Sequence, residues 1–178
     1  MIEAKQLVKS FKSGDSVTTV LKTVDFKAAK GEFVAIMGRS GAGKSTLLYQ
    51  LSLLDHPTSG DIIVEGKNAS TMTSPERVKF RLTEFGYVFQ DYALMPELTA
   101  LENVALPLLM QDRGRRAAYA EAEKSLTRAG LAHRLNNLPS QMSGGEQQRV
   151  SIARAVAHAP KVLFADEPTA NLDNESSR

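Results

Sequence analysis

The sequence predicts an α/β fold, in which a mixed core begins with an antiparallel β part and is interrupted by an inserted α-helical lobe. Three observations lead to this prediction. Residues 1–90 read mainly as strands with two helices, residues 91–141 carry only helical patterns, and a helix and an apolar run return after residue 142. We therefore expect one domain over residues 1–178, with a core of residues 1–90 and 142–178 and a lobe of residues 91–141.

The first part of the core reads as strands around one helix. Residues 24–28 alternate between apolar and polar, as a strand does, whereas residues 33–37 (FVAIM) are apolar throughout and predict a strand buried on both faces. Four leucines at helical spacing predict the buried face of a helix. They are Leu47, Leu48, Leu51 and Leu54. Further strands are expected at residues 61–64 and 85–89.

Helix signals occur between the last two of these strands and within the lobe. Ser74 followed by Pro75 predicts the start of a short helix. Thr99 with Glu102 has the capping-box pattern that begins a helix. A second lobe helix should end at Gly130. Its buried face is expected to carry Ala118, Ala122, Leu126 and Ala129.

The core resumes with a helix and a strand. The helix is expected from about Glu146 to His158, because Pro160 stops it. Residues 162–165 (VLFA) are all apolar and predict another strand buried on both faces, which ends at Asp166.

Composition excludes several classes of protein. Lys and Arg number 22 against 20 Asp and Glu, and the resulting charge of +2 is too small to indicate nucleic acid as a partner. The absence of cysteine excludes a disulfide scaffold and suits a reducing compartment. No stretch is long and apolar enough to span a bilayer, and no basic leader precedes an apolar segment.

A complete phosphate-binding loop follows the apolar run at 33–37. Residues 38–45 match G-x-x-x-x-G-K-S between a predicted strand and an amphipathic helix, which is the context this motif requires. Its glycines let successive N–H groups point at phosphate oxygens, and the helix directs its positive end to the same place. Lys44 would neutralise the β- and γ-phosphates, and the Ser45 hydroxyl would hold Mg²⁺.

Two carboxylates follow the last apolar run. Asp166 stands at the carboxyl end of the predicted strand, where it can hold Mg²⁺, often through water. Glu167 stands where a base could polarise a water that attacks the γ-phosphate. Two adjacent acids alone would also suit an exposed turn, but the phosphate loop in the same chain favours the metal and base roles.

The last helix begins with a third motif. Ser143, Gly144 and Gly145 open this helix and offer a second anion site. Ser143 with Glu146 also forms a capping box, which would explain the serine without any ligand. One nucleotide does not obviously need two such helix starts, so we expect Ser143 to contact a nucleotide held by a second molecule.

Together with Gln90 and the Asn-Leu-Asp of residues 171–173, these motifs resemble the nucleotide-binding subunit of an ATP-binding cassette (ABC) transporter. The resemblance covers essentially the whole chain, with five motifs in the family's order. Residues 87–90 (YVFQ), 94–99 (LMPELT) and 102–107 (ENVALP) resemble the lipoprotein-releasing and macrolide-exporter branch. The resemblance implies a P-loop NTPase core of the RecA-like type.

The resemblance also implies a role for each matching residue. Lys44, Gln90 and Glu167 are expected to be catalytic. Ser45, Gln90 and Asp166 are expected to serve Mg²⁺. Phe11 should stack on adenine, and Asp173 should lie in the loop that crosses a dimer interface. The full set of expected nucleotide-binding residues is Phe11, Gly38, Arg39, Ser40, Gly41, Ala42, Gly43, Lys44, Ser45, Thr46, Ser143, Gly144, Gly145 and Asp173.

The function that the resemblance implies is ATP hydrolysis, by in-line attack of water, that powers export or the extraction of a substrate. The cofactors are ATP and Mg²⁺, with two ATP molecules held between two subunits. The partners are a second nucleotide-binding subunit, forming a homodimer, and transmembrane permease subunits contacted through residues 90–107. The chain would then be peripheral, on the cytoplasmic face of the inner membrane.

The sequence departs from the family pattern at three places. Phe11 stands where tyrosine is usual, and Met142 stands where leucine is usual, a swap that nearly conserves volume. The sequence ends at Arg178, before the family's switch histidine, which none of its three histidines can be. We therefore expect a chain that is incomplete at its C-terminus and that hydrolyses ATP weakly.

Two alternatives stay open. A regulatory ABC ATPase of the cell-division type would carry the same motifs and transmit force without moving a solute, so only the membrane partner distinguishes it. A small-molecule P-loop kinase would share residues 38–45. Glu167 directly after Asp166, and the Ser143 helix start, disfavour the kinase, and phosphate release without any acceptor would exclude it.

Overall fold

The computed structural model describes residues 1–168. The chain divides into two compact units, Met1–Val78 and Lys79–Arg178, each with its own sheet. Asp173, expected at a dimer interface, lies outside the described residues. The division into a core and a lobe stays a prediction.

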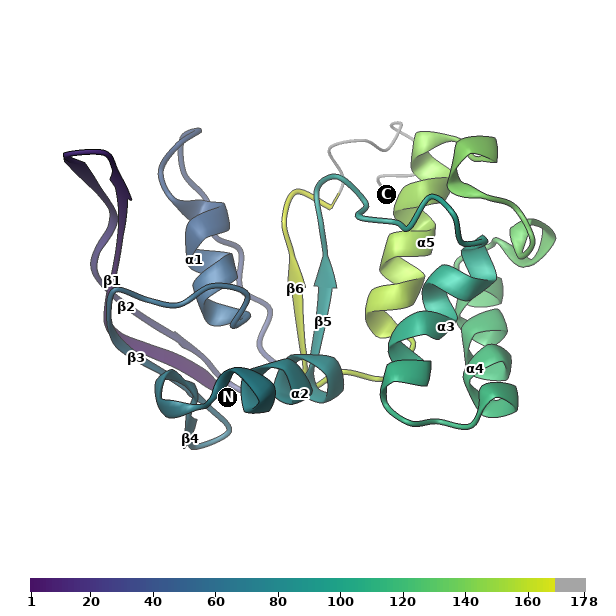
Figure 1. Ribbon diagram of the computed structural model, residues 1–178, viewed down its shortest axis with the longest axis horizontal. Coiled ribbons are helices and arrows are strands. Elements are labelled where there is room, and N and C mark those ends of the chain that lie inside the picture. The colour runs from purple at the N-terminus through teal and green to yellow at the C-terminus, as the bar shows by residue number, and fades with distance from the viewer. Residues whose placement is uncertain (169–178) are drawn as a thin grey trace. The chain divides into compact units, whose positions relative to one another are not determined.

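The first unit is built on the antiparallel sheet that the sequence predicts (Figure 1). Its strand order is β2-β1-β3-β4, and the strands are β1 (Ile2–Ser13), β2 (Ser16–Ala28), β3 (Ser59–Val64) and β4 (Lys67–Asn68). Helix α1 (Lys44–Leu51), the short 3₁₀ turn η1 (Ala69–Thr71) and the start of α2 (Ser74–Glu84) complete the unit. The alternation predicted at residues 24–28 is confirmed, because every second residue of this part of β2 is half-buried.

A buried arginine ties the elements of this unit together. Arg77 is only 2% exposed, and its guanidinium donates hydrogen bonds to the carbonyl oxygens of Leu53 at 3.1 Å, Asp55 at 2.7 Å and Ala69 at 3.3 Å. A buried charge is tolerated only where its donors are satisfied. Arg77 therefore fixes the turn after α1 against η1 and α2.

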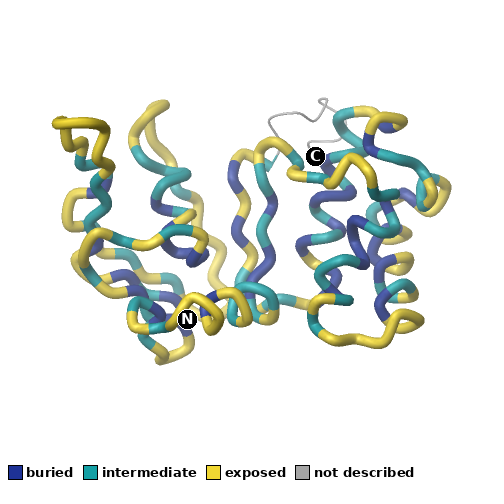
Figure 2. Tube along the Cα trace, in the orientation of Figure 1, coloured by how far each residue is buried: buried dark blue, intermediate teal, exposed yellow. Residues whose placement is uncertain are grey.

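The second unit combines a two-stranded parallel sheet with a helical bundle. Strands β5 (Phe85–Val88) and β6 (Val162–Ala165) pair in parallel, and three helices follow the periodicity that the sequence shows. These are α3 (Ala100–Met110), α4 (Arg115–Arg128) and α5 (Gly144–Val156), accompanied by the 3₁₀ turns η2 (Ala132–Arg134) and η3 (Pro139–Gln141). The buried residues gather where the helices pack (Figure 2). They include Val104, Leu108, Ala118, Ala122, Leu126 and Val150.

The predicted helix signals are confirmed. Thr99 and Glu102 form the complete capping box of α3, and the backbone N–H and hydroxyl of Thr99 lower the pKa of the Glu102 carboxyl. Gly130 follows α4 in the left-handed region, at φ 74°, where a glycine is not strained. Helix α2 begins at Ser74, and α5 begins two residues before Glu146.

Three expectations about burial are wrong. Residues 33–37 form no strand, and Phe33 is 94% and Met37 89% exposed, because no strand in residues 1–168 pairs with this run. Helix α1 ends at Leu51, so Leu54 is 41% exposed while Leu53 is 1% exposed. Strand β6 is not buried on both faces, since Leu163 is 50% exposed. An apolar sequence favours burial, but it does not supply the partner strand that burial needs.

His158 makes the folding stability of the second unit depend on pH. Its Nε2 donates to the carbonyl oxygen of Phe85 at 2.9 Å, and among residues 1–168 its buried Nδ1 has no partner. Burial lowers the pKa of His158 below its ordinary value of 6.5, with the charge of Arg113 adding to this effect. Because the folded protein disfavours the charged imidazole, folding stability is greatest above the pKa that His158 has in the unfolded chain. Folding stability is lost as the pH falls below that value.

We expect His158→Gln to reduce this loss. A glutamine amide can still donate to Phe85 but does not titrate. Between pH 7.5 and 5.5 the melting temperature of the variant should therefore fall less than that of wild type, by about 2 °C or more. Differential scanning fluorimetry measures this difference. His56→Gln, which replaces an exposed imidazole, is the control and should keep the wild-type pH dependence. An equal change of melting temperature with pH in His158→Gln and wild type would show that His158 is not the source of the pH dependence.

Candidate functional site

The predicted phosphate loop leads directly into α1 in the first unit. Gly41 and Gly43 take left-handed φ values of 76° and 90°, and the Ala42 N–H donates to the Arg39 carbonyl oxygen at 3.2 Å. The first N–H groups of a helix have no acceptor inside it, and the N-cap residue of α1, Gly43, has no side chain to cap them. The Lys44 ammonium lies back on the loop, 3.1 Å from the Gly38 oxygen. The loop thus offers backbone amides and the Lys44 ammonium to an anion.

Glycine is required at position 43 by a close approach. A Cβ there would lie 2.9 Å from Cγ1 of Val20 and 3.3 Å from Cδ2 of Leu21, both on β2. Val20 is an extra residue in its strand, because Leu21 pairs with Lys9 while Thr19 pairs with Ser10. This bulge in β2 faces the loop and sets its position.

Phe11 lies in the same unit and near the same bulge. It is on β1, is 46% exposed, and pairs with Thr18. Thr18 is two residues from Val20, which corresponds to about 7 Å along a strand. A nucleotide whose phosphates lie on the loop could therefore bring its base to this ring, and an exposed aromatic face suits stacking.

The second unit brings Gln90 and the two acidic residues to one edge. Val88 of β5 pairs with Ala165 of β6, so the parallel strands end side by side. Gln90 Nε2 donates to Glu167 Oε2 at 3.0 Å. The Asp166 N–H donates to the Val88 oxygen at 3.0 Å, and Asp166 is only 6% exposed. These side chains form a polar edge at the carboxyl ends of the strands, where α/β proteins bind their ligands.

Helix α5 holds the two loops of this edge, and the sequence did not single out the residues that do so. Gln148 Nε2 donates to the oxygen of Pro168 at 2.8 Å, beside Glu167, whose φ of 47° is left-handed. Arg154 donates to the oxygens of Tyr92 at 2.8 Å and Ala93 at 2.6 Å, which are also left-handed. Left-handed residues other than glycine cost about 1–2 kcal/mol each, so they need such support. Polar residues on the inward face of a predicted helix are the signal that could have identified both.

Ser143 caps α5 in the manner that its sequence predicts. Its Oγ accepts from the Glu146 N–H at 3.2 Å, and Glu146 in turn accepts from the Ser143 N–H and from Arg134 Nε, each at 2.8 Å. These two donors, the backbone N–H first, lower the pKa of Glu146. A contact of the Ser143 hydroxyl with the Glu146 carboxylate contributes to the lowering as well, so this hydroxyl serves the cap. The ligand role of Ser143 stays a prediction.

The expected site residues therefore fall into two groups. Phe11 and residues 38–46 belong to the first unit, and Gln90, residues 143–145, Asp166 and Glu167 belong to the second. Within residues 1–168, no three acidic or histidine side chains gather to hold a metal ion. Mg²⁺ is usually held by one or two carboxylates and by the phosphates of its substrate, and the carboxylate of Asp166 is a ligand of that type.

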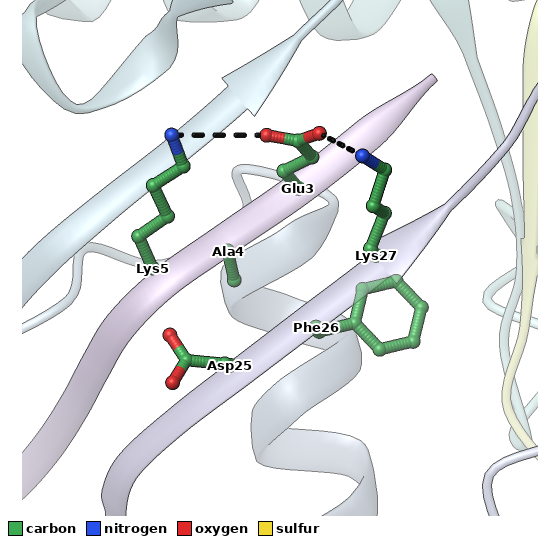
Figure 3. A pocket seen from close by; sticks show the side chains of 6 residues that line it. All are labelled: Glu3, Ala4, Lys5, Asp25, Phe26 and Lys27. Carbon is green, nitrogen blue, oxygen red and sulfur yellow. Dashed lines mark ion pairs between the residues drawn. The ribbon is translucent and has the colours of Figure 1, made fainter.

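A depression of about 550 Å³ on β1 and β2 contains none of these residues (Figure 3). Its lining is Glu3, Ala4, Lys5, Asp25, Phe26 and Lys27. Both lysines pair with Glu3, Lys27 at 2.9 Å and Lys5 at 3.9 Å, and the Lys27 hydrogen bond lowers the pKa of Glu3. Paired charges leave this surface little affinity for phosphate.

Comparison with known proteins identifies the family. The ABC transporter family matches residues 21–170. An uncharacterized ABC transporter ATP-binding protein of Methanocaldococcus jannaschii is 50% identical over 99% of this chain and 79% of its own length. The lipoprotein-releasing system ATP-binding protein LolD of Shewanella oneidensis is 45% identical over 99% of this chain and 76% of its own. None of the helices that the structure describes has the length and apolar character needed to cross a membrane.

Solved structures agree with this match. A dimeric ATP-binding cassette in a post-hydrolysis state, bound to ADP and Pi, superimposes with a TM-score of 0.94 at 41% identity. The superposition covers 99% of this chain and 78% of that one. The α/β P-loop fold predicted from the sequence is thereby confirmed, and the chain belongs to the ABC transporter ATP-binding family.

Proposed function

We propose that this chain powers a transporter of the lipoprotein-releasing and macrolide-exporter branch, and that Glu167 is its catalytic base. Members of this family are ATP-binding and ATP-hydrolysing subunits of transporters, and this chain is one of them. The observation that carries the assignment of the base is the 3.0 Å hydrogen bond from Gln90 to Glu167 beside the buried Asp166. This bond connects the Gln90 amide, which can orient a water molecule, with the Glu167 carboxylate, which can accept a proton from that water.

Each of the proposed site residues has its own role in hydrolysis. The loop amides and Lys44 hold the triphosphate and offset its charge. The Gln90 amide donates its hydrogen bond to Oε2 of Glu167, so Oε1 is the oxygen that would accept a proton from water. That water attacks the γ-phosphorus while the bond to the ADP oxygen breaks, and the products are ADP and phosphate. Ser45 and Asp166 would hold Mg²⁺, which supplies further positive charge to the phosphate oxygens when it is bound.

A second copy of the chain is the proposed partner for Ser143. The Ser143 hydroxyl and the N–H groups of Gly144 and Gly145, which open α5, would face the γ-phosphate of the nucleotide on the other copy. One related ATP-binding cassette has been solved as a dimer in two structures, which supports this arrangement. Each site would then be complete only when two chains meet.

The permease contact is proposed for the exposed part of residues 90–107. Asn103 is fully buried, and its amide binds the N–H and oxygen of Met95 at 2.8 and 3.1 Å, so the loop has a fixed shape. Leu94 packs against the helical core, whereas Met95 is 47% exposed. One relative is named for lipoprotein release. Another, a Pasteurella multocida protein 46% identical over 27% of its own length, is named as a macrolide export ATP-binding/permease protein. We therefore place this chain at the cytoplasmic face of a membrane, attached through its permease.

Glu167→Gln tests the base. The variant should bind ATP within about twofold of wild type and lose at least about 100-fold in turnover, because it removes the proton acceptor but keeps a partner for Gln90. Phosphate release and nucleotide titration measure the two effects. Glu123→Gln, on the exposed side of α4, should hydrolyse as wild type does. Near-normal turnover by Glu167→Gln would exclude Glu167 as the base.

Gly43→Ala tests the phosphate loop. The added Cβ would meet Val20 at 2.9 Å and would also occupy a φ of 90°, so the loop must move. We expect ATP affinity to fall by about tenfold or more. Gly114→Ala, where a Cβ meets open space, is the control and should bind ATP normally. Unchanged affinity in Gly43→Ala would show that phosphate does not rest on this loop.

Met95→Asp tests the permease contact. The exposed Met95 can be changed without disturbing the core, so the variant should keep ATP affinity and lose capture by permease subunits. Met110→Asp, equally apolar and 58% exposed at the end of α3, is the control and should retain capture. The test is co-purification with the permease subunits, and capture by Met95→Asp at the wild-type level would place the contact elsewhere.

A further inference from the structure

One lysine of the first unit has three partners at a position that is mostly shielded from solvent. The Lys9 side chain is 12% exposed. Its ammonium lies 2.7 Å from Asp55 Oδ2, donates to the His56 oxygen at 2.7 Å, and lies over the ring of Phe11, 5.0 Å from the centroid. An ammonium within about 6 Å of a ring centroid is attracted to the ring face. The position of this charge therefore bears directly on the orientation of Phe11.

The position of the charge is set by elements outside the β1–β2 hairpin. Asp55 Oδ2 also accepts from Gln50 Nε2 at 3.0 Å, and Gln50 is a fully buried residue of α1. The buried Arg77 donates to the Asp55 carbonyl oxygen at 2.7 Å. Burial alone would raise the pKa of Asp55, but the hydrogen bonds from Lys9, His56 and Gln50 lower it, so the carboxylate is ionised at neutral pH.

Helix α1 is consequently connected both to the phosphate loop and, through Asp55, to Lys9. Its N-terminus carries Lys44 and the phosphate loop, and Gln50 near its C-terminus holds the Asp55 carboxylate to which Lys9 is bound. The ammonium covers one face of the Phe11 ring, while the residue remains 46% exposed. A ring fixed in advance loses less conformational freedom when a base stacks on its other face.

We propose that Lys9, held by Asp55, is a positioning residue that fixes the Phe11 ring for the adenine base of ATP. This inference rests on the proposed nucleotide site and assigns Lys9 and Asp55 to its base end. Lys9 acts through Phe11 and does not contact the phosphates, so its removal should weaken binding of the base and leave binding of the triphosphate unchanged.

The experiment compares Mg-ATP with Mg-tripolyphosphate, which has the phosphates without the base. Wild type should bind ATP more tightly than tripolyphosphate. Lys9→Met should weaken ATP binding by about three- to fivefold and bind tripolyphosphate as wild type does. Lys9→Arg keeps a cation that can pair with Asp55 and lie on the ring, and it should restore ATP binding. Lys22→Met, an exposed lysine of the same hairpin, is the control.

Asp55→Asn provides a second test that leaves Lys9 in place. This variant should also weaken the binding of ATP and leave the binding of tripolyphosphate unchanged, because the Lys9 ammonium loses the partner that fixes it. Equal weakening of both ligands by Lys9→Met, or of neither, would overturn the positioning role. Wild-type protein that binds tripolyphosphate but gains nothing from the base would overturn the base site as well. Wild-type protein that binds neither ligand would overturn the proposed function, and this inference with it.

Discussion

The parallel register of β5 and β6 is the constraint on which the polar edge formed by Gln90, Asp166 and Glu167 depends. Val88 lies opposite Ala165, so the residues that follow each strand emerge together and Gln90 reaches Glu167 at 3.0 Å. A shift of one residue would turn every side chain of one strand to the other face and separate this pair. The register is supported by the aromatic contact of Phe85 with Phe164 across the strands, whose centroids are 5.2 Å apart.

Both groups of expected site residues use backbone conformations that the surrounding structure must hold. In the first unit, Gly43 fits only because it has no Cβ against the bulge at Val20. In the second unit, the left-handed backbone at Glu167 is followed by a carbonyl that Gln148 binds, and Arg154 binds the left-handed turn after Gln90. Side chains from packed helices thus fix loops that carry reactive groups, which is the usual way to keep such groups in place.

Local signals in the sequence predicted much of this architecture, since each has a local physical cause. The Thr99 capping box and the glycine-rich loop need only neighbouring residues, and both are found where expected. The apolar run at 33–37 was assigned wrongly because burial of a strand depends on a partner that local sequence does not specify. The sequence carries no local signal for the proposed role of Lys9 either, because that role comes from contacts with residues 55 and 56, far along the chain.

A crystal structure with Mg²⁺ and a nonhydrolysable ATP analogue would test the central claim most directly. The triphosphate should rest on the N–H groups of the loop that ends at Lys44, with adenine on Phe11. A water held by Gln90 and Glu167 should lie in line with the γ-phosphate, within hydrogen-bond reach of the carboxylate. A nucleotide bound with its phosphates away from the loop, or a γ-phosphate that no water held by Glu167 can reach, would contradict the account.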